Sequence, residues 1–270
     1  MHIGIVAQQD NPRAAALADE IRRHTDSTVS IDEATASALG CDGTPVGELA
    51  ACDIVVSIGG DGTFLFAARE VAPTPLIGVN LGEVGFLNVV SPSEAVEAIR
   101  AEVERFRDGT ARCQELPQIQ AVGEGWTLPA AVNEVAVLGP RRSRGNGVEI
   151  EVRVDSQLYS GGQADGVLVS TPTGSTAYNL SEGGPLVHPT VPAFVVTEMC
   201  AVESMPPLAV SLDAEVTIRV DGAEHAFVVA DGRTRERIET PTNVTLRRAA
   251  DPVRIAGPPL EFFTALGKLG

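Results

Sequence analysis

Short apolar runs alternate with segments of helical spacing over the first 108 residues. Strands are predicted at 2–7, 29–31, 53–58 and 76–79. Helices are predicted at 12–25, at 64–71 and after Ser91. Strands that alternate with helices are typical of a largely parallel sheet covered by helices. The intervening stretch 34–50 is small, polar and glycine-containing, and its pattern predicts no element.

The helix after Ser91 has a start signal in its own sequence. Ser91-Pro92-Ser93-Glu94 has the spacing of a capping box, with proline at the first helical position. The apolar side of this helix comprises Val96, Ile99, Val103 and Phe106. We therefore expect a helix that is capped by Ser91 and ends at Gly109.

An alternation of apolar and polar positions replaces the helical spacing after Gly109. It runs through 148–154, 216–220, 244–246 and 253–255. The turn-forming pairs are Asp155-Ser156, Asp221-Gly222 and Asp231-Gly232. No long helix is predicted between 110 and 251. Period-two runs separated by such pairs indicate antiparallel β-sheet.

The chain is therefore predicted to form two domains. An N-terminal three-layer α/β domain comprises residues 1–108, and a C-terminal antiparallel β-sandwich domain comprises residues 109–255. The tail 256–270 is apolar at Leu260, Phe262, Phe263, Leu266 and Leu269. Such a surface is stabilised by burial, so we expect the tail to return to the first domain.

The middle of the chain contains a strand, a turn and a short helix in close succession. The apolar run 167–169 predicts a buried strand that Pro172 ends. Thr173 or Ser175 can cap a helical turn over 176–182. With an acid before the strand and hydroxyls after it, the segment can surround a polar ligand. An ordinary structural corner is the alternative.

The net charge limits the possible partners. The chain has 36 acidic and 20 basic residues, giving a formal net charge of −16 at pH 7, and Lys268 is its one lysine. Because the acids are spread along the whole chain, nucleic acid and anionic membranes are excluded as partners. The same surface suits a cytosol of very high salt, where repulsion is screened. We therefore expect a halophilic source; an acidic protein from an arginine-preferring genome is the alternative.

Targeting and cysteine signals point to the cytoplasm. No apolar run is long enough to cross a bilayer, and Met1 leads into a predicted strand instead of a signal peptide. Cys41, Cys52, Cys113 and Cys200 are widely spaced, without a CxxC pair, so reduced and mostly buried thiols are expected. The four histidines are equally scattered and indicate no zinc site.

A glycine-rich loop with an acid follows the strand 53–58. Gly59-Gly60-Asp61-Gly62-Thr63 lies where α/β proteins bind ligands, between a strand end and a helix. Glycines let the main chain approach phosphate, whereas a carboxylate repels it unless it serves as a base, binds a metal ion or orients a hydroxyl. The combination indicates phosphoryl transfer to an alcohol. A glycine-rich turn with a capping aspartate is the alternative.

Other phosphate-binding fingerprints are absent from the sequence. A GxxxxGK[ST] loop needs a lysine, and the single lysine lies at position 268. No GxGxxG opens a predicted helix, and the protein-kinase signatures are missing. P-loop kinases, Rossmann-type dinucleotide binding and protein kinases are therefore excluded.

Several blocks, in this order, resemble the signature segments of the NAD kinases. They are Gly59–Thr63, Gly78-Val79-Asn80 with Gly85-Phe86-Leu87, Asn133-Glu134, and Asp165–Tyr178 followed by Leu180-Ser181 and Gly183-Gly184-Pro185. The resemblance spans residues 53–240. Its specificity comes from the long block at 165–185, because the GGDGT block is shared with phosphofructokinases and lipid kinases.

The resemblance implies roles position by position. Asp61 matches a general base acting on the 2′-hydroxyl of the adenosine ribose of NAD. Gly60, Gly62 and Thr63 belong to the same loop and are expected to meet phosphates. The pair Asn133-Glu134 matches a contact to the ribose and adenine, with an amide donor and a carboxylate clasping hydroxyls. By itself, that pair would indicate a turn.

Further NAD contacts are implied by the long block and its neighbours. Asp165 matches an acid near the nicotinamide-ribose half. The lining of the dinucleotide pocket is matched by Thr176, Ala177, Tyr178, Asn179, Leu180 and Ser181, with Tyr178 available for stacking. Arg144 falls where the family has another NAD contact, although Arg141 and Arg142 are alternative matches.

The chain departs from the family pattern at three places. Gln163 stands where many bacterial members have a basic residue that bears on the choice between NAD and NADH. Asp231-Gly232-Arg233 resembles a family Asp-Gly-Gln, with Arg233 replacing the amide. The segment 201–206 lacks the histidine of a family Pro-His-Ser-Leu. These departures leave the implied base in place.

The implied activity is transfer of a phosphoryl group from ATP or polyphosphate to NAD, which gives NADP. Mg²⁺ or another divalent cation is expected with ATP, and a homodimer or homotetramer is expected. Two alternatives stay open: a GGDGT-type kinase of another alcohol, such as a lipid or sugar, and a non-catalytic NAD(P)-binding sensor. The donor and the preference between NAD and NADH are not decided by the sequence.

Overall fold

The computed structural model describes residues 1–82, 85–140 and 147–267. The chain forms two compact units. The first unit comprises residues 1–116 and 252–270, and the second comprises residues 117–251.

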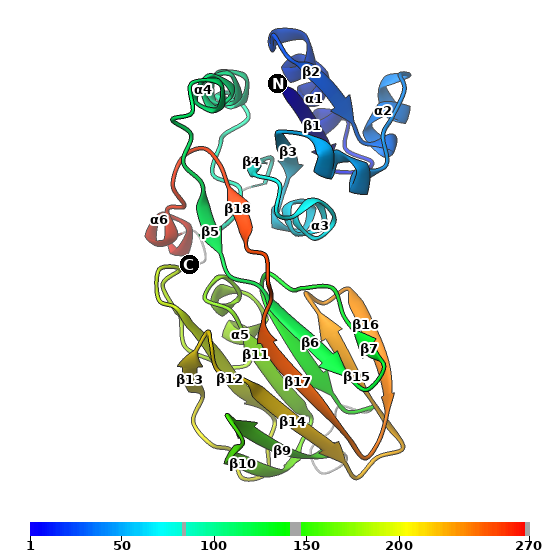
Figure 1. Cartoon of the computed structure of the whole chain (residues 1–270), viewed down its shortest axis with the longest axis vertical. Helices are drawn as coiled ribbons and strands as arrows, with labels where there is room; N and C mark the ends of the chain where they lie inside the picture. Colours follow the sequence, from blue (N-terminus) through cyan, green and yellow to red (C-terminus); the bar gives the residue numbers. More distant parts are fainter. Residues whose placement is uncertain (83–84, 141–146, 268–270) are drawn as a thin grey trace. The chain divides into compact units, whose positions relative to one another are not determined.

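A six-stranded sheet forms the centre of the first unit (Figure 1). In spatial order its strands are β2 (Thr28–Ile31), β1 (His2–Ala7), β3 (Ile54–Gly59), β4 (Leu76–Asn80), β18 (Val253–Ile255) and β5 (Gln114–Leu116). All pairs are parallel except β18 with β5. The tail that begins at residue 256 belongs to the first unit, which confirms its predicted return, and the Ala256 amide donates to the Leu76 carbonyl at 2.7 Å. Residues 253–255 were expected to continue the antiparallel β domain; they pair antiparallel with β5, but in the first-unit sheet, because a three-residue strand is too short for period two to identify its sheet.

Helices cover both faces of this sheet, as the three-layer prediction requires. The helical elements are α1 (Pro12–His24), α2 (Glu33–Leu39), η1 (Val46–Ala51), α3 (Asp61–Val71), α4 (Ala95–Arg107) and α6 (Phe262–Leu266). Helix α1 packs with α2 and α4, whereas α3 packs with η1. Ile3, Ile5 and Ile54 point into the α1–α4 layer. Gly4 lies between them and faces Leu49 of η1 on the opposite side.

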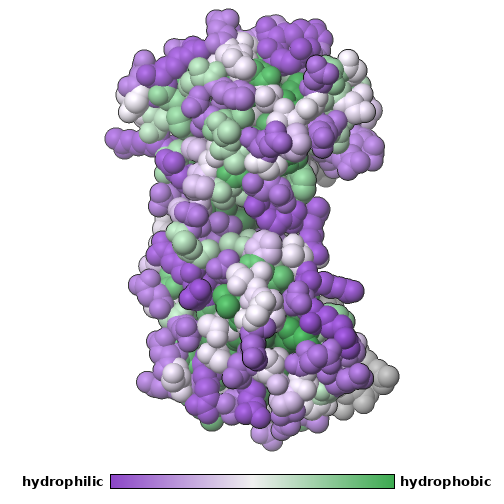
Figure 2. Space-filling model, turned by 45° about the vertical axis from the view of Figure 1, so that its right-hand side comes forward, coloured by the Kyte–Doolittle hydropathy of each residue, from purple (hydrophilic) through white to green (hydrophobic). Residues whose placement is uncertain are grey.

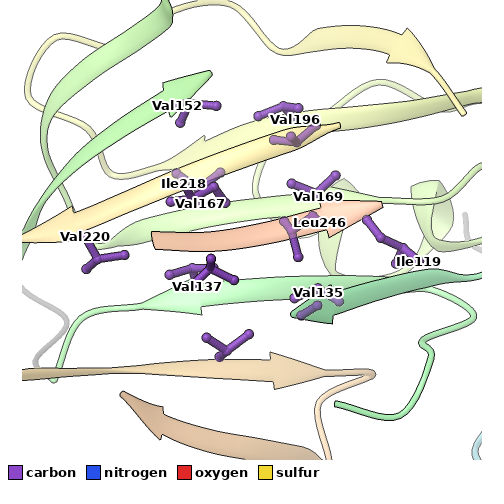
Figure 3. Packing of buried hydrophobic residues seen from close by; sticks show 14 of the residues in the cluster. Ile119, Val135, Val137, Val152, Val167, Val169, Val196, Ile218, Val220 and Leu246 are labelled. Carbon is purple, nitrogen blue, oxygen red and sulfur yellow. The ribbon is translucent and has the colours of Figure 1, made fainter. Parts of the chain in front are cut away.

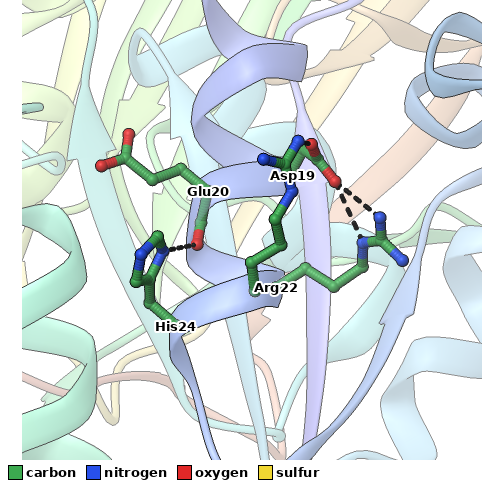
Figure 4. A network of polar contacts seen from close by, with 5 residues as sticks. Asp19, Glu20, Arg22 and His24 are labelled. Atoms are coloured by element: carbon green, nitrogen blue, oxygen red, sulfur yellow. Dashed lines mark hydrogen bonds and ion pairs between the residues drawn. The ribbon is translucent and has the colours of Figure 1, made fainter.

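Helix α1 shows how local signals fix an element. Asn11 caps its start by accepting hydrogen bonds from the amides of Arg13 and Ala14 at 3.0 and 3.4 Å. Near its end, Asp19 accepts hydrogen bonds from Arg22 at 2.6 Å and from Arg23 (Figure 4). Basic side chains in a last turn also favour the negative end of the helix dipole, which supports termination at His24.

One stretch of this unit was left unassigned by the sequence, and one local prediction was wrong. The unassigned stretch 34–50 overlaps α2 and η1, whose small polar residues gave no apolar period. Helix α4 begins at Ala95 instead of following a Ser91 cap. The Ser91 hydroxyl donates to the Glu94 carboxylate at 2.5 Å, and residues 92–94 form a turn. The two side chains that define a capping box thus bind each other.

The second unit is a sandwich of two six-stranded antiparallel sheets, as predicted. One sheet has the order β10 (Gln157–Ala164), β9 (Val148–Val154), β14 (Val216–Asp221), β17 (Thr242–Arg248), β6 (Ile119–Gly123) and β7 (Trp126–Thr127). The other has β13 (Leu208–Ser211), β12 (Ala193–Met199), β11 (Gly166–Ser170), β8 (Glu134–Leu138), β15 (His225–Ala230) and β16 (Thr234–Glu239). Val137 and Val167 of the second sheet pack in one cluster with Ile218 and Leu246 of the first (Figure 3).

The turns of the second unit agree with the predictions, whereas the exposure of several apolar or thiol side chains does not. Asp155, Ser156 and Gly222 adopt positive φ, as turn pairs between antiparallel strands require. Hydrophilic residues cover most of the face shown in Figure 2. The expectation that the thiols are mostly buried was wrong, since Cys41 and Cys200 are exposed. Phe263 of the apolar tail is likewise 75% exposed.

Candidate functional site

Asp61 lies at the start of α3, directly after β3. Strand β3 ends at Gly59, Gly60 is the N-cap residue, and the helix includes Asp61 itself. The predicted helix start at residue 64 was therefore three residues late. Gly59 is required by packing, because a Cβ there would lie 2.4 Å from the Thr63 hydroxyl oxygen. The turn between strand and helix thus fixes the position of Asp61.

Three donors hold the Asp61 carboxylate. The backbone amide of Phe86 donates to Oδ2 at 2.8 Å, and that of Leu87 donates to Oδ1 at 3.1 Å. The side-chain amide of Asn88 lies 3.4 Å from Oδ1. A carboxylate has about four lone-pair sites, so these contacts orient it and leave capacity for a hydroxyl. The acid is half-buried, which keeps it accessible to a substrate.

The loop after β4 provides these donors. Asn88 is 2% exposed, and its side-chain oxygen would lie 2.2 Å from a Cβ at Gly78. The glycine of the Gly78-Val79-Asn80 block therefore makes room for the residue beside Asp61. A cavity of about 370 Å³ adjoins this loop and is lined within the first unit by Asn80, Phe86, Asn88 and part of the tail. Asn88 was not predicted as a site residue, because backbone and amide contacts across 27 positions have no local sequence signal.

In the second unit, Asp231 organises the backbone around the Asn133-Glu134 pair. Its carboxylate accepts hydrogen bonds from the amides of Val132, Asn133 and Glu134 at 2.9, 2.7 and 3.2 Å. Asp231 and Gly232 have φ of 47° and 66° in the turn between β15 and β16. Asp231 and Gly232, which match the family pattern, therefore have a structural role. Their turn places Arg233, which departs from that pattern, beside the start of β8.

Glu134 is a buried acid with an altered protonation equilibrium. Its side chain belongs to a residue that is 6% exposed. Burial first, and then the neighbouring Asp231 carboxylate, raise the pKa of Glu134 from 4.5 to about 8, against the lowering effect of a hydrogen bond from the Tyr178 backbone. At pH 7 the group is therefore mainly a neutral carboxylic acid, which can donate as well as accept a hydrogen bond.

A pocket of about 370 Å³ in the second unit brings three predicted residues together. Glu134, Tyr178 and Arg233 all line it. The remaining lining residues are Ala136, Leu138, Gly139, Pro140, Phe227, Val229, Gly232 and Arg235. Phe227 and Arg235 were not predicted, because alternating arginines on a strand resemble an ordinary solvated face. The pocket combines an apolar floor, two aromatic rings, one buried acid and two cations.

The corner after β11 differs from its prediction in detail. It forms η2 (Thr173–Thr176) and α5 (Tyr178–Ser181), and neither start has a side-chain cap. The proposed capping by Thr173 or Ser175 was therefore wrong. The Ser175 hydroxyl instead donates to the carbonyl of Pro172 at 2.7 Å and accepts from the amide of Val187 at 3.0 Å. The hydroxyl-rich sequence is used in part to hold its own corner together.

The other predicted contacts are distributed over the second unit. Thr176 and Ala177 are half-buried at the corner, Leu180 and Ser181 are exposed, and Gln163 is exposed on β10. Asp165 is buried at the start of β11.

Two of the proposed contacts need a different description. Asn179 is fully buried; its amide donates to the Pro185 carbonyl at 3.0 Å and accepts from Thr197 at 2.9 Å, so it supports the corner from inside. Arg144 lies outside the described residues.

The described ranges contain neither a cluster of metal ligands nor a helix that could span a membrane. Between 1 and 267, apart from 83–84 and 141–146, no three His, Cys, Asp or Glu side chains gather as metal ligands. Over the same ranges, no helix has both the length and the apolar character needed to cross a bilayer.

Comparisons with known proteins agree over the whole chain. Residues 43–106 match the ATP-NAD kinase N-terminal domain, and residues 132–256 match the ATP-NAD kinase C-terminal domain. The NAD kinases of Natronomonas pharaonis and Halobacterium salinarum are 67% and 56% identical, each with full coverage of both chains. The crystal structure of an Archaeoglobus fulgidus NAD kinase in complex with ATP aligns with TM-score 0.81 and 25% identity over all of both chains. Yeast NADH kinase, solved with NADH, shares the fold at TM-score 0.86, with 20% identity over all of this chain and 87% of its own.

Proposed function

The chain belongs to the NAD kinase family, and on that premise we propose that it phosphorylates the 2′-hydroxyl of the adenosine ribose of NAD to form NADP. The observation that carries the proposal is full-length identity of 67% and 56% to two curated NAD kinases. The held carboxylate of Asp61, at a glycine-rich strand end, supports it chemically. ATP or polyphosphate is the proposed donor.

Asp61 is the proposed general base. The ribose 2′-oxygen attacks the terminal phosphorus of the donor, the bond from that phosphorus to the bridging oxygen breaks, and ADP leaves when ATP is the donor. The 2′-hydroxyl proton passes to Asp61 and then to solvent. Because a carboxylate is a far weaker base than an alkoxide, the proton moves late, and alignment and charge stabilisation supply most of the acceleration.

The remaining predicted residues are proposed as binding groups. Gly60, Gly62 and Thr63 would meet phosphate, and Glu134, Tyr178 and Arg233 would contact NAD through the second-unit pocket. Asn133, Gln163, Asp165, Thr176, Ala177, Leu180 and Ser181 are also kept as proposed contacts, and Asn179 as a support of the corner. Mg²⁺ enters with the donor. Mg²⁺ is commonly bound by substrate phosphates and water, so no protein ligand is assigned to it here.

A homodimer or homotetramer in the cytoplasm is proposed for the assembled enzyme. The test of function is NADP formation from NAD with ATP or polyphosphate, in molar KCl, for the wild type, Asp61→Asn and Asp10→Asn. Asp10 has φ of 56°, a conformation that asparagine also adopts, so its variant is a matched control.

We expect Asp61→Asn to lower kcat by about 10²–10⁴-fold, as for loss of a general base, with unchanged NAD affinity. Asp10→Asn should retain wild-type turnover. Turnover of diacylglycerol or fructose phosphate but not NAD would select a different alcohol kinase. Tight NADP binding without turnover under any donor would select a sensor, and near-normal kcat in Asp61→Asn would remove the assigned role.

A further inference from the structure

Arg235 is stacked on an aromatic ring in the second-unit pocket. Its guanidinium carbon lies 4.9 Å from the centroid of the Phe227 ring, and both residues line the pocket. His225 meets the same ring edge-on, at a centroid distance of 5.3 Å. A guanidinium held over an aromatic ring still has N–H groups that can donate to a planar acceptor. Phe227 therefore helps to hold a charged donor at the pocket.

The charge of Arg235 is not neutralised locally. Among the described residues no carboxylate forms an ion pair with it. Arg237, two residues further along β16, pairs with Glu239 at 2.8 Å. Arg233 adds a second cation to the lining.

The buried acid of the same pocket, Glu134, has an oxygen without a hydrogen-bond partner among the described residues. This oxygen, Oε2, is buried. A buried polar atom without a partner is costly, which favours a ligand that supplies a donor there. The aromatic rings of Tyr178 and Phe227 offer stacking surfaces beside it. The lining thus suits a ligand with a ring, a hydroxyl or amine, and an anionic group.

We propose that Arg235 binds a phosphate group of the bound dinucleotide. This inference rests on the proposed function, because NAD and NADP are the phosphate-bearing ligands that it supplies. The phosphate is either the diphosphate, which both ligands have, or the 2′-phosphate, which only NADP has. Arginine suits either, since its planar fork matches phosphate oxygens.

The test compares Arg235→Met with Arg237→Met in the full-length protein. Each variant removes one positive charge from β16, and methionine keeps much of the side-chain length. Calorimetric titration in one fixed KCl concentration measures the Kd of NAD, NADP and adenosine. For Arg235→Met we expect weakening of about 10- to 100-fold for a phosphate-bearing ligand, the range for a hydrogen bond to a charged group. Adenosine, which has no phosphate, should bind within twofold of wild type and also shows that the pocket is folded.

The outcomes separate the two phosphates and the two proposals. Equal losses for NAD and NADP assign the diphosphate, and a loss confined to NADP assigns the 2′-phosphate. Arg235→Met behaving like Arg237→Met, or losing adenosine as strongly as NAD, overturns the inference while wild-type NADP formation keeps the proposed function. If the wild type binds NADP in an Arg235-dependent manner but makes none, the function fails and the phosphate contact stands.

Discussion

Replacing Glu134 by glutamine should change how the stability of the second unit depends on pH. The native pKa of Glu134 is about 8, against 4.5 for the free side chain, with burial as the main cause. Between these values the native state holds a proton that the unfolded state has released. The free energy of unfolding therefore falls as pH rises through this window, and the stabilisation present at low pH is lost by about pH 8.

The size of this effect follows from the two pKa values. Each unit of difference is worth about 1.4 kcal/mol, so the span from 4.5 to about 8 gives at most about 5 kcal/mol. Glutamine has nearly the same shape and does not ionise. Relative to the wild type, Glu134→Gln should therefore gain several kcal/mol of stability between about pH 5 and pH 9.

Urea unfolding in constant molar KCl measures the difference. Trp126, the single tryptophan of the chain, lies in β7 and reports unfolding of the second unit by fluorescence. Glu149→Gln, at an exposed position of β9, is the matched control and should keep the wild-type pH dependence. If the stability difference between Glu134→Gln and wild type stays constant within about 0.5 kcal/mol from pH 5 to 9, which is the scatter of ordinary surface substitutions, the buried-acid reasoning is refuted.

Two further predictions concern packing and charge. Gly174→Ala should lower the free energy of unfolding by about 1–3 kcal/mol or more and weaken NAD binding, because its Cβ would lie 2.0 Å from the Asn133 carbonyl oxygen. Gly47→Ala, whose Cβ would meet open space, should be neutral in the same urea titration. The Tm should rise when KCl is raised from 0.1 to 1 M, because the net charge of −16 is then screened over about 3 Å instead of about 10 Å; an unchanged Tm would contradict the halophilic interpretation.

The sequence predicted the main features of the fold for physical reasons. Buried strands such as β3 and β11 are continuous apolar runs, and the sandwich strands β9 and β14 alternate as their half-exposed positions demand. The GGDGT segment was correctly predicted to join strand β3 to a helix, because glycines directly after an apolar run end a strand, although α3 begins within the segment at Asp61. Short elements such as β18 and α2 lack enough residues to define a period, so their placement depends on tertiary contacts.

Site residues were not predicted from the sequence where their role depends on partners far along the chain. Asn88 contacts Asp61 across 27 positions, and nothing in its immediate sequence indicates this. Arg235 and Arg237 alternate on one strand and cannot be distinguished by pattern. Only the structure shows that Arg235 lies over the Phe227 ring at a pocket, whereas Arg237 forms an ion pair with Glu239.

The Asn133-Glu134 pair, the weakest motif by sequence, has the strongest convergence of contacts in the second unit. The carboxylate of Asp231, 98 positions from Asn133, accepts a hydrogen bond from the Asn133 amide at 2.7 Å. Thr171 donates its own amide to the Asn133 carbonyl at 2.8 Å, and Gly174 packs against that carbonyl. Two separate segments thus fix one short stretch of backbone and leave Glu134 buried at a pocket. Because so much structure specifies the position of an acid whose burial is costly, we infer that ligand recognition, and not stability, is the reason for a carboxyl group there.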